Sequence, residues 1–191
     1  MTRRIYNFEN PDRFVAGAIG QPGSRTFYLQ AREGERIVSV LLEKLQVGLL
    51  AERLTQLLAE LRERGAKVPD GPTPADVDAA PLDEPINEVF RVGTMAIVWD
   101  GDDESIVIEA AAMGEDDAAE DAIHEVTDEV AEIDVDAEPD VVRVHLDPPR
   151  ALAFAQRALD VVAAGRPPCP FCGQPLNPEG HVCARRNGFM N

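Results

Sequence analysis

The sequence is short of several features that would place it in a definite class of protein. No apolar run approaches the roughly 20 residues needed to cross a bilayer, and no apolar stretch follows the two N-terminal arginines as it would in a secretory signal. We therefore expect a cytoplasmic protein without a membrane span. Cysteine is also scarce. All three cysteines lie within residues 169–183, which excludes a disulfide framework that spans the chain.

Basic residues are missing from one long segment. Residues 100–140 contain 18 acidic residues and no Lys or Arg, whereas the rest of the chain has 17 acidic and 18 basic residues. The net charge of −17 therefore belongs to this segment, and the remainder is nearly neutral. A nucleic-acid-binding domain usually carries a clear cationic excess, so the composition does not favour nucleic acid as a partner.

Recognised catalytic motifs are absent as well. The chain has no G-x-S-x-G, Walker or H-E-x-x-H sequence. A non-enzymatic role is therefore favoured, and if the protein is an enzyme its catalytic residues are unknown. Three arginines, Arg13, Arg25 and Arg53, would form an anion-binding site if the predicted strands and helix bring them together. The alternative is that they are separate solvated charges.

A strong periodic pattern is present in the first half of the chain. β-forming runs at residues 14–19, 26–30 and 37–41 are separated by turns that contain glycine. Leucines at a spacing of about 3.6 residues then predict an amphipathic helix over residues 42–64, which Gly65 ends.

The second half repeats this pattern after a proline-rich segment, residues 66–87, that is predicted to be a linker or surface loop. Its strand-like runs are residues 89–99, 105–111 and 141–146. A helix is predicted over residues 148–164, because Asp147 is a favourable N-cap and prolines fit the first helical turn.

The two halves also resemble each other in sequence. Ile37–Glu43 and Val141–Asp147 match at a constant offset of 104 residues. This match indicates either internal duplication or the apolar alternation and acidic cap that any strand-to-helix junction shares. We predict an α+β fold in which a duplicated βββα unit forms one mainly antiparallel-sheet domain, with a cleft between the halves as the default ligand site.

The most specific motif lies near the C-terminus. Cys169 and Cys172 are separated by two residues, and His181 and Cys183 by one, with a loop of prolines and glycines between the pairs. Thiolate and imidazole ligands at such spacing predict one tetrahedral Zn²⁺ site. Four protein ligands leave no position for water, so the ion would be structural. Redox cycling of the C-x-x-C pair and unligated thiols are the alternatives.

These features define the expected domain organisation. One α+β domain covers residues 1–165, and a small C-terminal zinc knuckle covers residues 166–191. Within the domain we expect unit one at residues 11–65, the linker at residues 66–87 and unit two at residues 88–165. Unit two contains the acidic insertion at residues 114–139. The insertion would be a loop that keeps the protein soluble, docks on a basic partner or covers the arginine-bearing cleft.

Several stretches together resemble a known family. They are Pro11–Gly17, Gly23–Gln30, Leu42–Lys44 with Gln46 and Val47, and the closing Cys-Pro-Phe-Cys-Gly and Gly-His-Val-Cys-Ala-Arg-Arg-Asn-Gly-Phe. With these residues the chain resembles an uncharacterised actinobacterial family labelled DUF3090. The resemblance covers nearly the whole chain. It implies an actinobacterial cytoplasmic protein and supplies no activity or catalytic residues to carry over.

Two functions are compatible with the sequence. The first is a zinc-binding cytoplasmic protein that acts as a non-enzymatic interaction or regulatory protein with a protein partner. The second is an enzyme or binding protein for a phosphorylated or other anionic metabolite, held in the cleft between the two units. Convergence of Arg13, Arg25 and Arg53 in one pocket would favour the second.

Overall fold

The structure is a computed structural model that describes residues 3–72, 77–114, 126–127, 139–165, 169–172 and 183. Its elements, in chain order, are β1 (Ile5–Phe8), β2 (Arg13–Ile19), β3 (Thr26–Glu33), β4 (Arg36–Leu42), α1 (Lys44–Glu63), β5 (Glu88–Asp100), β6 (Ser105–Ala112), β7 (Val126–Thr127), β8 (Val141–Leu146) and α2 (Pro148–Ala163). The strands and helices predicted for the two units are therefore present, whereas the acidic insertion, residues 114–139, lies outside the described residues except for residues 114, 126–127 and 139. Two short strands, β1 and β7, were not predicted.

The strands form one mixed sheet in the order β1-β8-β6-β5-β4-β3-β2, with β7 paired to β5 off this path. Neighbours within β2-β3-β4 and within β5-β6-β8 are antiparallel. The pairs β1/β8, β4/β5 and β5/β7 are parallel. The α+β class is confirmed, but the sheet is mixed because the added strands and the join between the halves are parallel.

Each half of the chain runs through three antiparallel strands into a helix, as β2-β3-β4-α1 and as β5-β6-β8-α2. The two halves lie side by side in the sheet. Because β4 and β5 are parallel, each strand of the first half runs in the same direction as the corresponding strand of the second half. The order βββα in both halves is the one that the sequence predicts. Origin by duplication stays a prediction.

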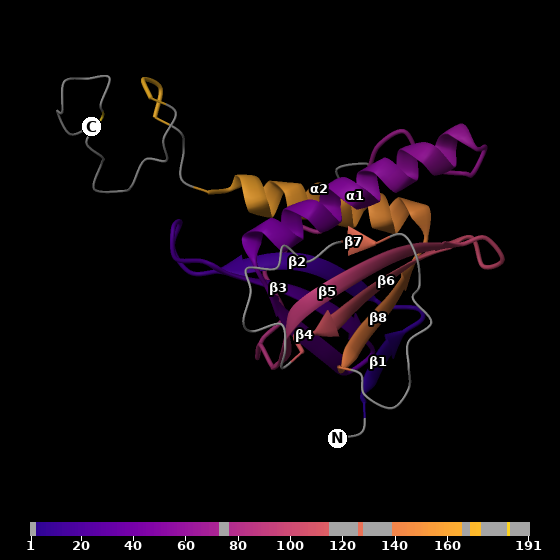
Figure 1. Cartoon of the computed structure of the whole chain (residues 1–191), viewed down its shortest axis with the longest axis horizontal. Coiled ribbons are helices and arrows are strands. Elements are labelled where there is room, and N and C mark those ends of the chain that lie inside the picture. The colour runs from indigo at the N-terminus through magenta and orange to yellow at the C-terminus, as the bar shows by residue number, and fades with distance from the viewer. Residues whose placement is uncertain are drawn as a thin grey trace.

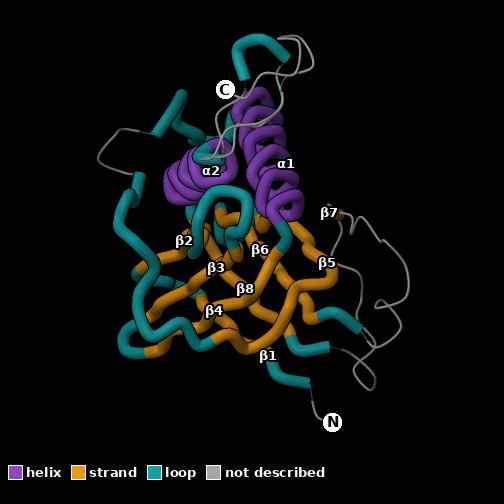
Figure 2. The backbone as a smooth tube through the Cα atoms, turned by 90° about the vertical axis from the view of Figure 1, so that its left-hand side faces the viewer, coloured by secondary structure: helices purple, strands orange, loops and turns teal. Residues whose placement is uncertain are grey.

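The two helices pack against each other on one side of the sheet, as Figures 1 and 2 show. A stripe of leucines on α1, including Leu50, Leu54 and Leu58, is fully buried. α2 begins as predicted, since the Asp147 side chain accepts a hydrogen bond from the main-chain N–H of Arg150 and prolines fill the first turn. No helix in the described part of the chain is both long enough and apolar enough to cross a bilayer.

The sheet strands have two different faces. In β3, Phe27, Leu29 and Ala31 belong to the core that the helices cover. By the two-residue alternation of a strand, Gln30 faces the other way, yet it is only 1% exposed. Something other than the helices therefore covers the second face of β2, β3 and β4.

That cover is a loop, residues 77–87, which we call the strap. Its described residues contain no helix or strand, as the proline content predicts. Gln30 Nε2 donates to the Asp83 carbonyl (3.0 Å), and the Asp83 N–H donates to Gln30 Oε1 (2.7 Å). Leu82 packs over Gly17, where an added Cβ would lie 2.6 Å from the leucine side chain. None of these contacts was predicted from the sequence.

The close approach at Gly17 generates a prediction with a matched control. In Gly17→Ala the new methyl group must displace Leu82, so we expect a loss of about 1–3 kcal/mol in the free energy of unfolding and faster proteolysis within the strap. Gly48 lies in α1 with nothing near its Cβ direction, so Gly48→Ala should instead stabilise by about 0.5–1 kcal/mol through helix propensity. Chemical denaturation measures both. Equal effects of the two substitutions would contradict the packing of Leu82 on β2.

Candidate functional site

The predicted metal ligands that the structure describes come together. The Sγ atoms of Cys169, Cys172 and Cys183 all lie within 4.8 Å of one another, and none of the three is in a disulfide. The Cys169 and Cys183 sulfurs are 4.0 Å apart. Two thiolates bound tetrahedrally at about 2.3 Å from one ion would be about 3.8 Å apart. The spacing therefore suits a shared metal ion, and these cysteines could bind one.

The local environment favours thiolate at Cys169. Burial of its sulfur opposes ionisation, but main-chain N–H groups of Cys172 and Phe171 and the neighbouring thiols outweigh it and lower the pKa of Cys169. The N–H of Phe171 donates to this sulfur at 3.5 Å. Main-chain donation to the first cysteine of a C-x-x-C turn is the arrangement that stabilises a metal-bound thiolate. His181, the predicted fourth ligand, lies outside the described residues.

The three arginines predicted to bind an anion lie in three different settings. Arg13 is in β2 and is paired with Asp78 and Asp83 of the strap. Arg25 lies over the Phe27 ring and donates to the Val161 carbonyl at the end of α2. Arg53 donates to Gln56 within α1. Within the described part of the chain, the contacts of Arg13, Arg25 and Arg53 given above share no residue, so they do not bring the three side chains into one site.

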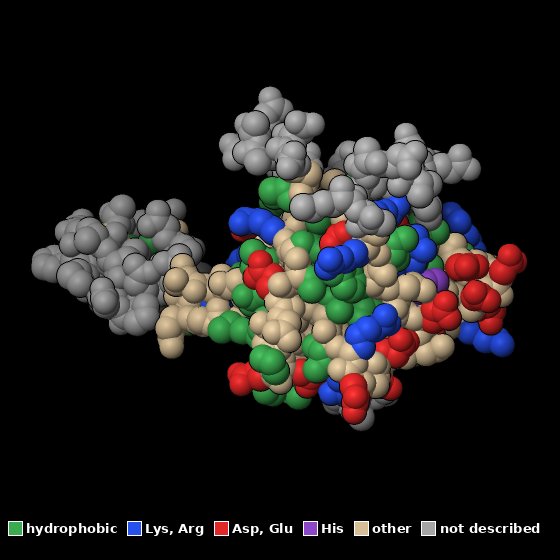
Figure 3. All heavy atoms as spheres, turned by 90° about the horizontal axis from the view of Figure 1, so that it is seen from below, with side chains coloured by type: hydrophobic (Ala, Val, Ile, Leu, Met, Phe, Trp, Pro, Cys, Tyr) green, Lys and Arg blue, Asp and Glu red, His purple; other side chains and the backbone are tan. Residues whose placement is uncertain are grey.

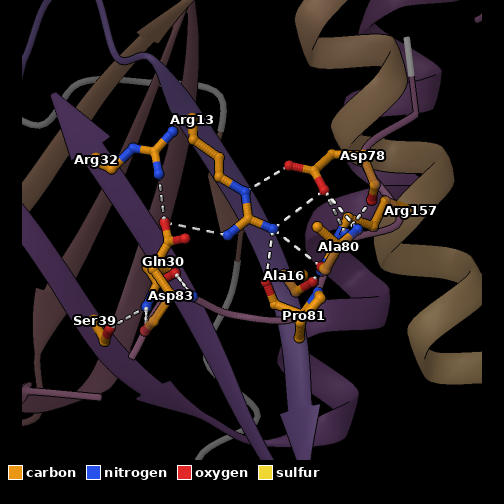
Figure 4. A network of polar contacts seen from close by, with 10 residues as sticks. All are labelled: Arg13, Ala16, Gln30, Arg32, Ser39, Asp78, Ala80, Pro81, Asp83 and Arg157. Carbon is orange, nitrogen blue, oxygen red and sulfur yellow. Dashed lines mark hydrogen bonds and ion pairs between the residues drawn. The ribbon is translucent and has the colours of Figure 1, made fainter. Parts of the chain in front are cut away.

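Arg13 instead forms a network with an arginine that the sequence analysis did not single out. Arg13 and Arg157 of α2 are only 9% and 7% exposed, and both guanidinium groups contact the carboxylate of Asp78 (Figure 4). Arg13 Nε is 2.5 Å from Asp78 Oδ2, and Arg157 Nη1 is 3.2 Å from Asp78 Oδ1. Other donors of the two side chains reach main-chain carbonyls of Ala16, Asp78, Ala80 and Pro81, whereas Arg13 Nη1 forms only an ion pair with Asp83.

The pKa shifts in this network follow from its geometry. The hydrogen bond from Arg13, partly offset by burial, lowers the pKa of Asp78. The hydrogen bond to Asp78 raises the pKa of Arg13. Burial lowers the pKa of Arg157, and the Arg13 charge adds to this effect while Asp78 opposes it. One signal in the sequence was available, because Arg157 occupies the buried stripe of α2 between Phe154 and Ala158, where an unpaired charge is disfavoured.

A second group of charged residues lies on the outer face of the other half of the sheet. They line an open hollow of about 490 Å³ between β5, β6 and β8, with lining residues Val98, Trp99, Asp100, Gly101, Asp102, Val107, Glu109, Arg143 and His145. Figure 3 shows acidic side chains gathered at the end of the molecule where β5 turns into β6. Glu109 accepts from Arg143 Nε at 2.5 Å, and Asp100 accepts main-chain N–H groups of the turn. The carboxylates of Glu109 and Asp100 thus make hydrogen bonds within the sheet and its turn.

The network predicts the behaviour of Asp78→Asn. At neutral pH the variant leaves two buried guanidinium groups without their shared anion, so we expect a loss of about 1–3 kcal/mol in the free energy of unfolding, moderated by the partial exposure of Asp78. Because folding lowers the pKa of Asp78 from its ordinary 3.8, the carboxylate contributes stability above that pH and loses it as the pH falls through the lowered value.

The stability difference between wild type and Asp78→Asn should therefore be constant near neutral pH and shrink below about pH 4. Denaturation curves at several pH values measure it. Asp70→Asn is the control, since Asp70 is fully exposed and its ion pair with Arg62 is long, at 3.8 Å. A pH-independent difference, or an equal loss in the control, would contradict the role of Asp78.

Comparison with known proteins places the chain in one family. A family model described as a protein of unknown function, DUF3090, matches residues 6–183, a span that holds every strand and helix except the first residue of β1. No curated protein and no solved structure matches the chain. The matched span includes both the arginine network and the three cysteines. On this evidence the chain belongs to the DUF3090 family.

Proposed function

We propose that Cys169, Cys172 and Cys183, together with His181, hold one structural Zn²⁺ ion. The observation that carries this proposal is the gathering of the three thiols within 4.8 Å of one another. Thiolates select soft or borderline ions, and the lowered pKa of Cys169 favours the charged ligand. His181 is two residues from Cys183 and would complete a tetrahedron. Four protein ligands leave no place for a reacting water, which argues for a structural ion.

The proposed ion would organise a docking surface in a non-enzymatic interaction or regulatory protein. Phe171 lies between two of the ligands in the sequence, and its side chain is 46% exposed. Aromatic side chains held by a rigid turn make effective anchors for a partner protein. A reducing cytoplasm, which keeps thiols free for metal, suits this role.

Metal analysis tests the ligand set. We expect one zinc per chain in protein purified under reducing conditions without chelators, and loss of most of that zinc in Cys169→Ser and in His181→Ala. His145→Ala is the matched control, because His145 lies in β8 at the open hollow and should leave the zinc content unchanged. Wild-type protein with well under one zinc per chain would refute the proposal, and equal loss in both histidine variants would remove His181 from the site.

The docking role has its own test. Phe171→Ser should keep one zinc per chain but lose the partners that cross-link to the wild-type protein in cytoplasmic extract. Ile19→Ser is the control, because Ile19 is equally exposed (47%) but lies at the end of β2. Quantitative mass spectrometry of cross-linked partners distinguishes the two variants. The surface around Phe171 is not the docking site if Phe171→Ser keeps the full set of partners. The same conclusion follows if the partners are lost when residues 114–139 are deleted and Phe171 is left in place.

A further inference from the structure

A small cavity lies between β2 of the first half and α2 of the second half. Its volume is about 190 Å³. The residues that line it are Asp12, Arg13, Phe14, Val15, Asp78, Pro149, Arg150, Ala153, Phe154 and Arg157. Three arginines thus share one cavity, and two of them were not among the arginines that the sequence pointed to.

The lining has an excess of positive charge. Arg13, Arg150 and Arg157 face only two carboxylates, those of Asp12 and Asp78. Asp78 is fully engaged by Arg13 and Arg157, and Asp12 accepts the main-chain N–H of Gly34 at 2.6 Å. Asp83 lies outside the lining and is shared by Arg13 and Arg32, so it balances only one of these two charges. The group as a whole therefore keeps an excess of one positive charge. In a partly buried cavity that imbalance favours binding of an anion.

Arg150 is the arginine with donors left for a ligand. Its Nη2 donates to the Pro11 carbonyl, and no other hydrogen bond of this side chain is found among the described residues. Arg157 differs, since its Nε, Nη1 and Nη2 all donate to protein acceptors. Arg13 is similar, although its Nη1 has no aligned acceptor and only an ion pair with Asp83 at 3.2 Å. Arg150 would therefore donate hydrogen bonds to the anion, and the positive charges of Arg13 and Arg157 would attract the anion without contacting it.

The rest of the lining decides the class of anion. The other lining residues are apolar: Val15, Pro149, Ala153 and the stacked rings of Phe14 and Phe154, whose centroids are 4.5 Å apart. Cavities for nucleotides and other large metabolites are usually 300–1,000 Å³, so this one is too small for them. A fully hydrated inorganic ion would leave the apolar wall unused. We propose that this cavity binds a small carboxylic acid, with its carboxylate at Arg150 and a short apolar tail against Ala153 and Phe154.

Isothermal titration calorimetry of the full-length protein with sodium butyrate tests the proposal. Sodium chloride at the same ionic strength, 1-butanol and inorganic phosphate are the comparison ligands. Saturable binding of butyrate is expected, with weaker or no binding of the other three, because only butyrate offers both a carboxylate and an apolar tail. Tighter binding of phosphate than of butyrate, or no saturable binding of butyrate, would overturn the proposal.

Arg150→Gln is the decisive variant, because Arg150 holds neither the strap nor the buried network and its replacement should leave the fold intact. Loss of a charge-assisted hydrogen bond should weaken butyrate binding by about tenfold or more. Arg64→Gln removes the same charge from the exposed end of α1 and should leave the affinity unchanged. Equal weakening in both variants would show that net charge alone attracts the acid, and it would refute the site. The readout is independent of zinc, so the two proposals succeed or fail separately.

Discussion

Two guanidinium groups lie almost out of water where the first half of the sheet meets α2, and their need for partners shapes this part of the molecule. An unpaired buried charge is disfavoured by several kcal/mol. Arg13 and Arg157 avoid that penalty by sharing Asp78 and by donating to main-chain carbonyls of β2 and the strap. A strand, a loop and a helix from three distant parts of the chain are thereby fixed to one another by a single cluster of charges.

The same cluster explains how a loop without regular structure can cover a sheet. No residue of the strap is fully buried, but its carbonyl groups that approach the buried arginines need donors, and the guanidinium groups supply them for Asp78, Ala80 and Pro81. Prolines reduce the opposite need, because they have no N–H to satisfy. Gln30 then pairs with both main-chain groups of Asp83. Side chains of the sheet and of α2 thus hold the strap, whereas a strand would be held by main-chain hydrogen bonds to neighbouring strands.

Features of the fold could be predicted from the sequence where the residues that determine them lie close together in the chain. Alternation, leucine spacing and the cap at Asp147 each act within a few residues, so strands and helices were predicted correctly, and so was the gathering of the cysteines. β1 was missed because it has four residues and its partner β8 lies 136 residues further along the chain. The arginine network was missed because Asp78 and Arg157 meet only in the folded chain.

Arg157 has one further contact with a wider consequence. β2 is the last strand of the sheet, so one of its sides has no neighbouring strand. An edge of this kind is a template to which another protein chain can add a strand, which is how many proteins begin to aggregate. Arg157 Nε donates to the Ala16 carbonyl in the middle of β2, at 2.8 Å. The helix thus occupies an acceptor that an incoming strand would need, so the arginine that ties the fold together also blocks one hydrogen-bonding position on the open edge of β2.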